Sequence, residues 1–387
     1  MSPANSSITV GKLITPPAML GILGGGQLGR YFVMAARTMG YGTTVLEPDP
    51  HSPAGKVADV HIVAAYDDPA ALDQLASTCA VVTTEFENAP AAAMDYLAAH
   101  TAVHPSPVAI ATCQDRIAEK AFLTEIGVGV APYRVIHAEA DVVEAATFTF
   151  PAVLKTARLG YDGKGQVRCD THEVLIDAWH QLGAVPCVLE QLLPLDRELS
   201  LVLARTADGR VACYPVAENQ HVAGILDVSV APAALPGAGH ADAAALCTYI
   251  AEELGFVGVM AVEMFVVGND VMVNELAPRP HNSGHYTLDA CLCSQFEQQV
   301  RAICGLALGE TEMVVPAVAM VNLLGELWAD GEPKWKRALW QGSAHLHLYG
   351  KHEPRPGRKM GHLTVTSATT VGATTLARRL RKRLTAG

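Results

Sequence analysis

A short apolar run that ends in three glycines constrains the fold of this chain more than any other feature of the sequence. Residues 18–23 form the run, and Gly24-Gly25-Gly26 leads directly into an amphipathic helical pattern. Short apolar runs bounded by turn residues are typical of buried parallel strands. Similar runs at residues 43–46 and 80–84 are separated by further helical patterns. The alternation predicts a doubly wound α/β domain with a parallel sheet.

The glycine turn also carries a binding signature. Gly24, Gly26 and Gly29 satisfy the pattern G-x-G-x-x-G, and Glu47 ends the second predicted strand about 20 residues further on. Such a turn lets backbone N–H groups and the positive end of a helix dipole approach an anion. The pattern is typical of dinucleotide binding, which makes a nicotinamide-dependent oxidoreductase one hypothesis. A purely structural turn is the alternative.

The composition excludes several classes of protein. The chain has 387 residues, and at about 150 residues per domain this length predicts two or three domains. Half of the residues are hydrophobic, which excludes a largely disordered chain. The net charge of 28 − 39 = −11 argues against a nucleic-acid partner. The sequence has no apolar run of about 18 residues that would suit a membrane, no secretory leader and no Cys-x-x-Cys. We therefore expect a cytoplasmic protein with free thiols and no membrane partner.

A second glycine-rich segment follows a predicted strand at residues 152–155. Lys155 ends that strand, and a loop with three glycines and Lys164 comes next. Backbone amides of such a loop can fold over phosphates, and the two lysines can supply positive charge. A hairpin turn built on Asp162-Gly163 is the alternative, and the loop alone does not decide between the two.

Two glutamates lie in apolar runs that predict a β-hairpin around Gly268-Asn269-Asp270. With these three residues as the loop, Val267 faces Val271, and four residues further along each strand Glu263 faces Glu275. Like charges opposite each other destabilise a sheet. A bound Mg²⁺ would remove the repulsion, because it takes one or two carboxylates together with phosphates and waters. A solvated face of the hairpin is the alternative.

Two polar segments could complete such a site. The segment 274–287 follows the second glutamate strand and carries Arg279, His281 and Asn282. Ordered polar loops after strands often carry function. The segment 349–362 contains a cluster of cations in an otherwise acidic chain: Lys351, Arg355, Arg358 and Lys359. This cluster suits a phosphate or carboxylate of a substrate, and a solvated loop is the alternative.

Together these segments resemble the ATP-grasp superfamily, and most closely the N5-carboxyaminoimidazole ribonucleotide synthetase family of purine biosynthesis. The resemblance runs from about Leu20 to about Val371 in the order of the family. Its most specific markers are residues 24–30, 161–166, 274–287, 294–296 and 357–362. The chain departs from the family at Leu159-Gly160, where members often have two glycines, and this puts the phosphate contacts of the loop in question.

The resemblance implies the domain organisation and the quaternary state. A flexible extension at 1–17 precedes a doubly wound α/β domain at 18–112. An ATP-grasp domain at 113–310 contains a mobile lid at about 133–190. A small C-terminal β-containing domain follows at 311–387, and a homodimer is expected.

The resemblance also implies roles for individual residues. ATP would be bound by Arg116, Lys155, Gly160, Tyr161, Asp162, Gly163, Lys164, Gly165, Gln166, Glu190, Gln191, Leu192, Leu193, Glu198, His221, Asn274 and Glu275. Within this set, residues 190–193 would line the adenine pocket and Glu198 would bind the ribose hydroxyls. Mg²⁺ would be held by Glu263 and Glu275. Aminoimidazole ribonucleotide would be bound by Gln27, Leu28, Glu85, Asp162, Asn282, Lys351, Arg358 and Lys359, the last three at its 5′-phosphate. The catalytic residues would be Asp162, Arg279, His281 and Asn282.

The implied reaction is the ATP-dependent carboxylation of 5-aminoimidazole ribonucleotide by bicarbonate, through carboxyphosphate, with release of ADP and phosphate. Asp162, His281 or the released phosphate could accept the amine proton, and the sequence leaves all three open. A formate-dependent glycinamide ribonucleotide transformylase would share the ATP site and the phosphate cluster. Residues 282–286 favour the carboxylating family instead. A non-catalytic nucleotide sensor would need a defective site, whereas every charged position is filled.

Overall fold

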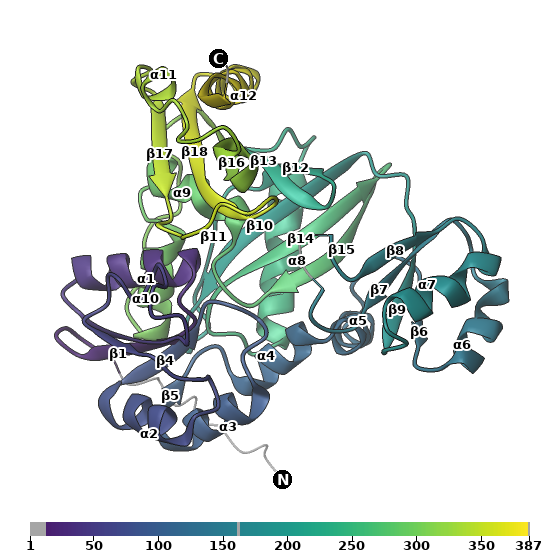
Figure 1. Cartoon of the computed structure of the whole chain (residues 1–387), viewed down its shortest axis with the longest axis horizontal. Helices are drawn as coiled ribbons and strands as arrows, with labels where there is room; N and C mark the ends of the chain where they lie inside the picture. The colour runs from purple at the N-terminus through teal and green to yellow at the C-terminus, as the bar shows by residue number, and fades with distance from the viewer. Residues whose placement is uncertain (1–12, 161–162, 386–387) are drawn as a thin grey trace, which may run out of the picture.

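The computed structural model describes residues 13–160 and 163–385, which form three β-sheets with helices packed against them. Figure 1 shows the N-terminal sheet at the lower left, a large sheet through the centre and top, and a small sheet at the right. The predicted extension at 1–17 lies mostly outside the described residues, and so do Tyr161 and Asp162.

The N-terminal sheet is doubly wound and parallel, as the sequence predicted. Its strand order is β3-β2-β1-β4-β5, and all four pairings are parallel. Its strands are β1 (Met19–Leu23), β2 (Gly42–Leu46), β3 (Val60–Ile62), β4 (Val81–Thr84) and β5 (Ala102–Val103). Its helices are α1 (Gln27–Thr38), α2 (Pro69–Thr78), α3 (Ala91–His100) and α4 (Pro107–Gln114). Asp68 caps α2 through the Ala71 N–H and precedes a proline, which is a common helix start.

Residues 133–191 form a separate four-stranded antiparallel sheet with the order β6-β9-β7-β8. The strands are β6 (Tyr133–Ile136), β7 (Ala152–Thr156), β8 (Gln166–Cys169) and β9 (Cys187–Gln191). Two helices, α6 (Glu139–Glu144) and α7 (Leu175–Gln181), contribute to its own apolar cluster. The helix α5 (Arg116–Glu125) precedes it and is capped by Asp115. The glycine-rich segment connects β7 and β8, so a hairpin connection and a candidate phosphate loop are the same piece of chain.

The third sheet has nine strands, and its main path runs β15-β14-β10-β12-β13-β16-β18-β17, with β11 beside β10. The strands are β10 (Arg197–Arg205), β11 (Val211–Cys213), β12 (Ala217–Val222), β13 (Ile225–Ala231), β14 (Gly258–Val267), β15 (Asp270–Ala277), β16 (Ala317–Leu324), β17 (Ala344–Leu348) and β18 (Lys359–Ser367). Its helices are α8 (Gly239–Glu253), α9 (Thr287–Ala290), α10 (Gln295–Ile303), α11 (Lys336–Leu339) and α12 (Thr370–Thr385). Because β13 pairs with β16, one sheet continues across residue 310.

The hairpin of β14 and β15 corrects one prediction. The loop is shorter than expected, so Val267 pairs with Asp270 and not with Val271. That shift alone would separate the two glutamates. A β-bulge at Asn274 adds one residue to β15 and restores the pairing of Glu263 with Glu275. The predicted pair is therefore present, although the register that predicted it is wrong.

Two expectations from the sequence concern membrane-spanning segments and the state of the cysteines. No helix among the described residues is long and apolar enough to cross a membrane. All nine cysteines are free thiols.

Candidate active site

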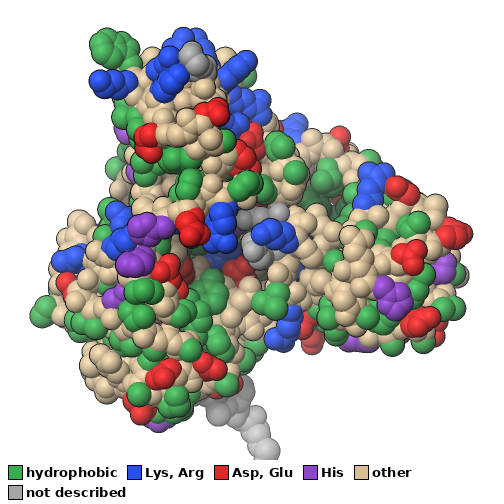
Figure 2. Space-filling model, in the orientation of Figure 1, with side chains coloured by type: hydrophobic (Ala, Val, Ile, Leu, Met, Phe, Trp, Pro, Cys, Tyr) green, Lys and Arg blue, Asp and Glu red, His purple; other side chains and the backbone are tan. Residues whose placement is uncertain are grey.

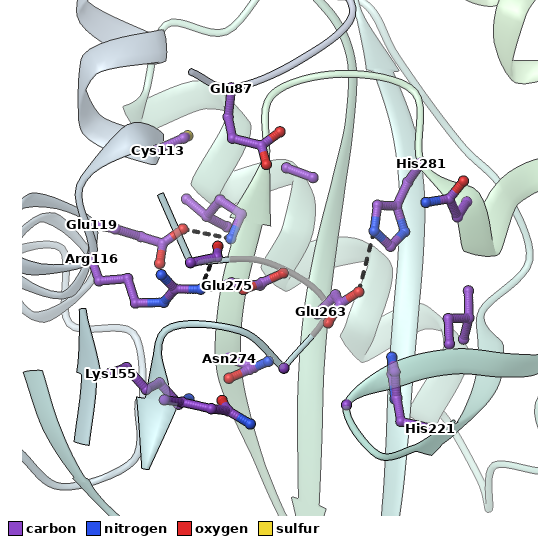
Figure 3. Close-up of a pocket in the computed structure, with 18 of the residues that line it drawn as sticks. Glu87, Cys113, Arg116, Glu119, Lys155, His221, Glu263, Asn274, Glu275 and His281 are labelled. Atoms are coloured by element: carbon purple, nitrogen blue, oxygen red, sulfur yellow. Dashed lines mark hydrogen bonds and ion pairs between the residues drawn. The ribbon is translucent and has the colours of Figure 1, made fainter. Parts of the chain in front are cut away.

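Two adjoining cavities lie where the sheets meet, with volumes of about 460 Å³ and 510 Å³. The first lies between the small sheet, α5 and the β14–β15 hairpin, and Figure 3 shows its charged lining. The second lies between the glycine turn and the loop from β17 to β18. Five residues line both: Glu87, Lys164, Arg279, Asn282 and Lys359. Groups bound in the two cavities would therefore share a boundary.

The first cavity collects most of the residues predicted to bind ATP and metal. They are Arg116, Lys155, Gly160, Gly163, Lys164, Gln166, Glu198, His221, Glu263, Asn274 and Glu275. Arg116 connects the loop to the hairpin, because its guanidinium donates to the Gly160 carbonyl (3.3 Å) and lies 3.6 Å from a Glu275 carboxylate oxygen. Leu159, at the departure from the family pattern, has φ +62°, a conformation that favours glycine.

The charges of Glu263 and Glu275, which face each other across β14 and β15, repel each other. Burial and the charge of Glu275 raise the pKa of Glu263 to about 7. A raised pKa means that the second negative charge is disfavoured at this position. A divalent cation between the carboxylates would remove this cost, so the residues fit the metal that the sequence suggested.

Glu198 and His221 form a polar pair on the wall of the first cavity. The Glu198 carboxylate lies 2.6 Å from His221 Nδ1. Burial opposes protonation of the ring, but the Glu198 carboxylate, which accepts from the ring, and the charge of Glu263 raise the pKa of His221 overall. This contact fixes both side chains at the wall of the first cavity.

Two residues that the sequence reading missed hold the backbone around Glu275. The Lys120 ammonium donates to the Asn274 carbonyl (3.0 Å), and the Glu119 carboxylate accepts from the Leu276 N–H (2.6 Å). Both side chains come from α5 and are buried. Lys120 also lies 3.5 Å from Glu190, whose other oxygen accepts from Lys155 at 2.8 Å. The signal in the sequence is an adjacent Glu-Lys pair within a helix, and helix periodicity alone does not show that both side chains are buried.

The second cavity is lined by all seven residues predicted for the ribonucleotide that the structure describes: Gln27, Leu28, Glu85, Asn282, Lys351, Arg358 and Lys359. The eighth, Asp162, lies outside the described residues, as does Tyr161. Arg355 lines the same cavity, so all four cations of the predicted cluster face it. Figure 2 shows blue side chains gathered around the central hollow of the molecule.

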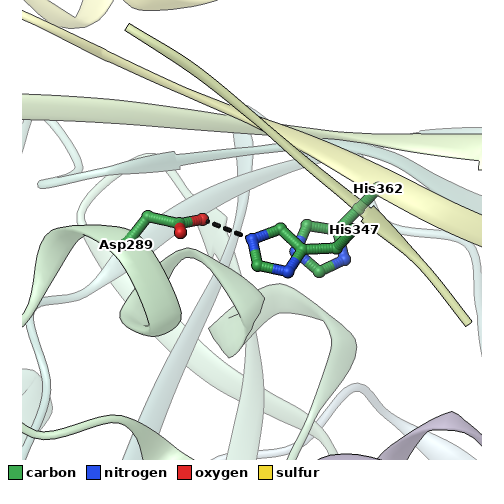
Figure 4. Close-up of side chains that lie close together, drawn as sticks. All are labelled: Asp289, His347 and His362. Carbon is green, nitrogen blue, oxygen red and sulfur yellow. Dashed lines mark hydrogen bonds and ion pairs between the residues drawn. The ribbon is translucent and has the colours of Figure 1, made fainter. Parts of the chain in front are cut away.

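The base of the cationic loop is fixed by a histidine cluster, shown in Figure 4. Asp289 on α9 lies 2.8 Å from His347 Nε2, and His347 stacks on His362 with an interplanar angle of 13°. Tyr349 is 2.9 Å from His362 Nδ1. Because the two rings are nearly parallel, one ion cannot lie in both ring planes, which disfavours a metal here. The cluster instead joins the β17–β18 hairpin to the segment that carries Asn282.

The glycine turn binds carboxylates of its own chain. Glu85 accepts from the Gly26 N–H and, at 2.6 Å, from the Gly29 N–H, while Glu47 accepts from the Gly25 N–H at 2.8 Å. A Cβ on Gly26 would lie 2.5 Å from a Glu85 oxygen, so a side chain there would displace the Glu85 carboxylate from the turn. The donors that would hold a dinucleotide pyrophosphate are therefore occupied, and the nicotinamide hypothesis is wrong.

Some predicted nucleotide residues line neither cavity: Gly165, Glu190, Gln191, Leu192 and Leu193. Glu190 is buried behind Lys155, and its carboxylate is paired with two lysines. The adenine pocket at 190–193 stays a prediction.

Three family models match consecutive parts of the chain. They are a ribonucleotide synthetase preATP-grasp domain at residues 18–114, an ATP-grasp domain at 121–296, and a phosphoribosylaminoimidazole carboxylase C-terminal domain at 318–374. With the fold and the two cavities, these matches define the class: the chain is an ATP-grasp enzyme, an ATP-dependent ligase.

Relatives specify the family within that class. The chain is 44% identical to N5-carboxyaminoimidazole ribonucleotide synthase of Brucella melitensis, over 91% of this chain and 97% of the relative. It is 42% identical to the Bacillus subtilis enzyme of that name, over 91% and 92%. The chain therefore belongs to the N5-carboxyaminoimidazole ribonucleotide synthetase family.

Solved structures agree with this assignment. An ADP complex of N5-carboxyaminoimidazole ribonucleotide synthetase matches with a TM-score of 0.90 and 41% identity, over 96% of this chain and 98% of that one. The Aspergillus clavatus enzyme, in complex with ADP and 5-aminoimidazole ribonucleotide, matches with a TM-score of 0.86 and 31% identity, over 95% and 98%.

Proposed function

We propose that this protein carboxylates 5-aminoimidazole ribonucleotide with bicarbonate and ATP, giving N5-carboxyaminoimidazole ribonucleotide, ADP and phosphate in purine biosynthesis. The observation that carries the proposal is the pair of adjoining cavities. One contains the carboxylate pair and the lysine-bearing loop, and the other contains the cationic cluster. The shared wall is where a carboxyl group made from ATP in one cavity would meet an amine held in the other.

ATP would be bound by cationic side chains and by a Mg²⁺ ion held on two glutamates. Lys155, Lys164 and Arg116 line the first cavity and would contact the phosphates. Glu263 and Glu275 would hold Mg²⁺, which would supply positive charge to the phosphates. Transfer of the γ-phosphoryl group to bicarbonate would yield carboxyphosphate, and no covalent enzyme intermediate is required. The work of these residues is to align the reactants and offset negative charge.

Carboxyl transfer would take place at the wall between the cavities. Arg279 lines both, and its Nε donates to Glu87 at 2.7 Å, which fixes the guanidinium. Burial opposes the charge of Arg279, but Glu87 raises its pKa overall, so it stays cationic beside the transferred carboxylate. Asn282, 3.3 Å from the Gln27 amide, would orient the ribonucleotide. Closure of the 133–190 segment over ATP would exclude water, which otherwise hydrolyses carboxyphosphate.

The test measures ADP release with MgATP and 5-aminoimidazole ribonucleotide, with and without added bicarbonate. We expect turnover to need the ribonucleotide and the carbon of labelled bicarbonate to enter an acid-labile product. Turnover that needs formate and glycinamide ribonucleotide would assign the chain to the transformylase reaction. ADP release that ignores both acceptors would overturn the proposal.

Removing one cation from the predicted phosphate-binding cluster should weaken the binding of the ribonucleotide and leave the binding of ATP largely unchanged. For Lys351→Ala we expect the KM for the ribonucleotide to rise by about 10-fold or more, because one charge-assisted phosphate contact is lost. The KM for ATP should change little. Steady-state kinetics with each substrate varied in turn makes the measurement, and an unchanged KM for the ribonucleotide would remove Lys351 from the phosphate site.

Affinity for Mg²⁺ should depend on pH. Because the pKa of Glu263 is raised to about 7, the metal must displace a proton below that pH. The apparent Kd for Mg²⁺ should therefore rise about 10-fold per unit as the pH falls from 7 to 5.5, and level off above 7.5. Calorimetric titration of Mg²⁺ with a non-hydrolysable ATP analogue present measures this. Glu263→Gln should bind Mg²⁺ weakly without this slope, and the same slope in the variant would contradict the assignment.

The enzyme is further proposed to work as a cytoplasmic homodimer. The nine free thiols support a reducing compartment, and the family resemblance supports the dimer. Sedimentation equilibrium of the purified protein, which distinguishes a mass of 40.9 kDa from twice that value, tests the dimer.

A further inference from the structure

The segment 294–296 is one of the markers of the family resemblance, but it has no part in the proposed reaction. It lines neither cavity, and it begins helix α10, where Ser294 accepts from the Glu297 N–H at 3.2 Å. The side chains of Gln295 and Phe296 are fully buried. A buried amide needs hydrogen-bond partners within the protein. The partners of Gln295 therefore indicate what this segment does.

The Gln295 amide binds both backbone groups of His281. The His281 N–H donates to Oε1 (2.9 Å), and Nε2 donates to the His281 carbonyl (2.8 Å). Because a backbone N–H only donates and a carbonyl only accepts, the orientation of the amide is fixed. The backbone N–H of Gln295 donates to Thr287 Oγ1 (3.1 Å), which in turn donates to the Gly284 carbonyl (2.7 Å). The start of α10 thus holds the segment 281–287 near both of its ends.

The segment held in this way lies at the boundary of the two cavities. His281 lines the first cavity, where its Nε2 lies 3.3 Å from a Glu263 oxygen (Figure 3). Asn282 lines both cavities, and its Oδ1 accepts from the Gln27 amide at 3.3 Å. Asn282 directly follows the residue that Gln295 holds. A shift of the His281 backbone would therefore move Asn282 away from Gln27.

Phe296 supports two other walls of the second cavity. Its ring centroid lies 4.9 Å from that of Tyr31 on α1, the helix beside α10 in Figure 1, and the same buried cluster contains Leu28 and Tyr349. Leu28 lines the second cavity. Tyr349 precedes the cationic loop, and the Lys351 ammonium lies 5.6 Å from the centroid of its ring. Adjacent residues of α10 thus contact three segments that surround one cavity.

We infer that Gln295 is a positioning residue for the ribonucleotide: it fixes the His281 backbone so that Asn282 stays against Gln27 at the boundary of the cavities. Phe296, next to it, supports the start of α1 and the base of the cationic loop. Gln295 contacts neither cavity, so it acts through Asn282 and not by binding substrate. This inference rests on the proposed function, because the ribonucleotide is the ligand named there.

Helix α10 contains a matched control for this role. Gln298 is also fully buried, and it makes the same pair of contacts with a different residue. It donates to the Gly309 carbonyl (2.7 Å) and accepts from the Gly309 N–H (2.8 Å). Gly309 lines neither cavity. Removing either amide leaves one backbone N–H and one carbonyl without a partner, so the two losses differ mainly in their place in the fold.

The first test compares Gln295→Met with Gln298→Met. Met has a similar length but cannot form the two hydrogen bonds, so we expect both variants to lower the Tm by similar amounts. Only Gln295→Met should raise the KM for 5-aminoimidazole ribonucleotide, by about 10-fold, with the KM for ATP changed less. Equal KM values for the ribonucleotide in the two variants would show that Gln295 is merely structural and would overturn the inference.

The second test asks whether Gln295 acts through Asn282. Asn282→Ala removes the side chain that Gln295 is inferred to position and should itself raise the KM for the ribonucleotide. Adding Gln295→Met to this variant should then change the KM by less than about 2-fold, because the two residues act on one contact. A full further increase of about 10-fold would show that Gln295 acts independently of Asn282 and would overturn the inference.

A milder variant covers the case in which Gln295→Met does not fold. Thr287→Val keeps the shape of the side chain but removes the hydroxyl between the Gln295 N–H and the Gly284 carbonyl. We expect the KM for the ribonucleotide to rise by about 3-fold and the KM for ATP to stay unchanged. Equal changes in both KM values, or none, would contradict the inference. A wild-type protein without ribonucleotide-dependent ADP release would overturn the proposed function itself.

Discussion

Glu275→Gln should lower Mg²⁺-dependent ADP release by about 100-fold or more, which corresponds to about 3 kcal/mol of transition-state stabilisation. The substitution keeps the shape of the side chain but removes one of the two charges that face each other on β14 and β15. The remaining Glu263 would have to hold the cation alone. Initial rates over a MgCl₂ titration, with ATP and the ribonucleotide saturating, measure the loss.

The same variant should not be less stable without metal. In the metal-free protein the two carboxylates repel each other, and burial together with the charge of Glu275 raises the pKa of Glu263 to about 7. Removing the Glu275 charge ends that repulsion, so we expect a Tm equal to or above that of the wild type in EDTA. Glu253→Gln, exposed on α8, is the matched control and should change neither quantity. Wild-type rates in Glu275→Gln would contradict the metal assignment.

The sequence was sufficient to predict the element types because the apolar patterns are strong. The runs at 18–23, 43–46 and 80–84 are the strands β1, β2 and β4 as predicted, and the glycine turn opens α1. The β14–β15 hairpin has a feature that the apolar pattern cannot predict. Periodicity predicts alternation along a strand, but it contains no signal for an extra residue such as Asn274. The bulge is supported instead by Lys120 and Glu119, more than 150 positions earlier in the chain.

The glycine turn was misleading for a related reason. G-x-G-x-x-G specifies a backbone with open N–H groups, and not the anion that reaches them. Here the anion is mainly Glu85, 59 positions beyond Gly26, which the parallel pairing of β1 with β4 brings to the same edge of the sheet. A local motif cannot report a partner that is brought in by topology. The predicted substrate residues, by contrast, come from the start of α1, from the segments that follow β4 and β15, and from the connection between β17 and the start of β18, which the fold gathers at one cavity.

Lys120→Met should have the second large effect, on stability as well as on activity. The Lys120 side chain is 1% exposed and contacts the Glu190 carboxylate and the Asn274 carbonyl at 3.5 Å and 3.0 Å. A buried charge left without any partner costs about 3–5 kcal/mol, and because Glu190 keeps Lys155 at 2.8 Å the loss should stay below that range. We expect a clearly lower Tm and a lower ATP-dependent rate, measured by calorimetry and by ADP release. Lys382→Met, exposed on α12, should change neither.

A double variant separates the ion pair from the backbone contact. If Lys120 acts by neutralising Glu190, adding Glu190→Gln to Lys120→Met should restore part of the stability, because the buried carboxylate is then uncharged and the partly exposed Lys155 can be solvated. Activity should not return to the same extent, since the Asn274 carbonyl beside Glu275 still lacks its donor. Full recovery of both would show that the backbone contact is dispensable and that Glu275 is oriented by the β14 ladder alone. Recovery of stability without activity would identify Lys120 as the residue that couples helix α5 and strand β9 to the position of the Glu275 carboxylate.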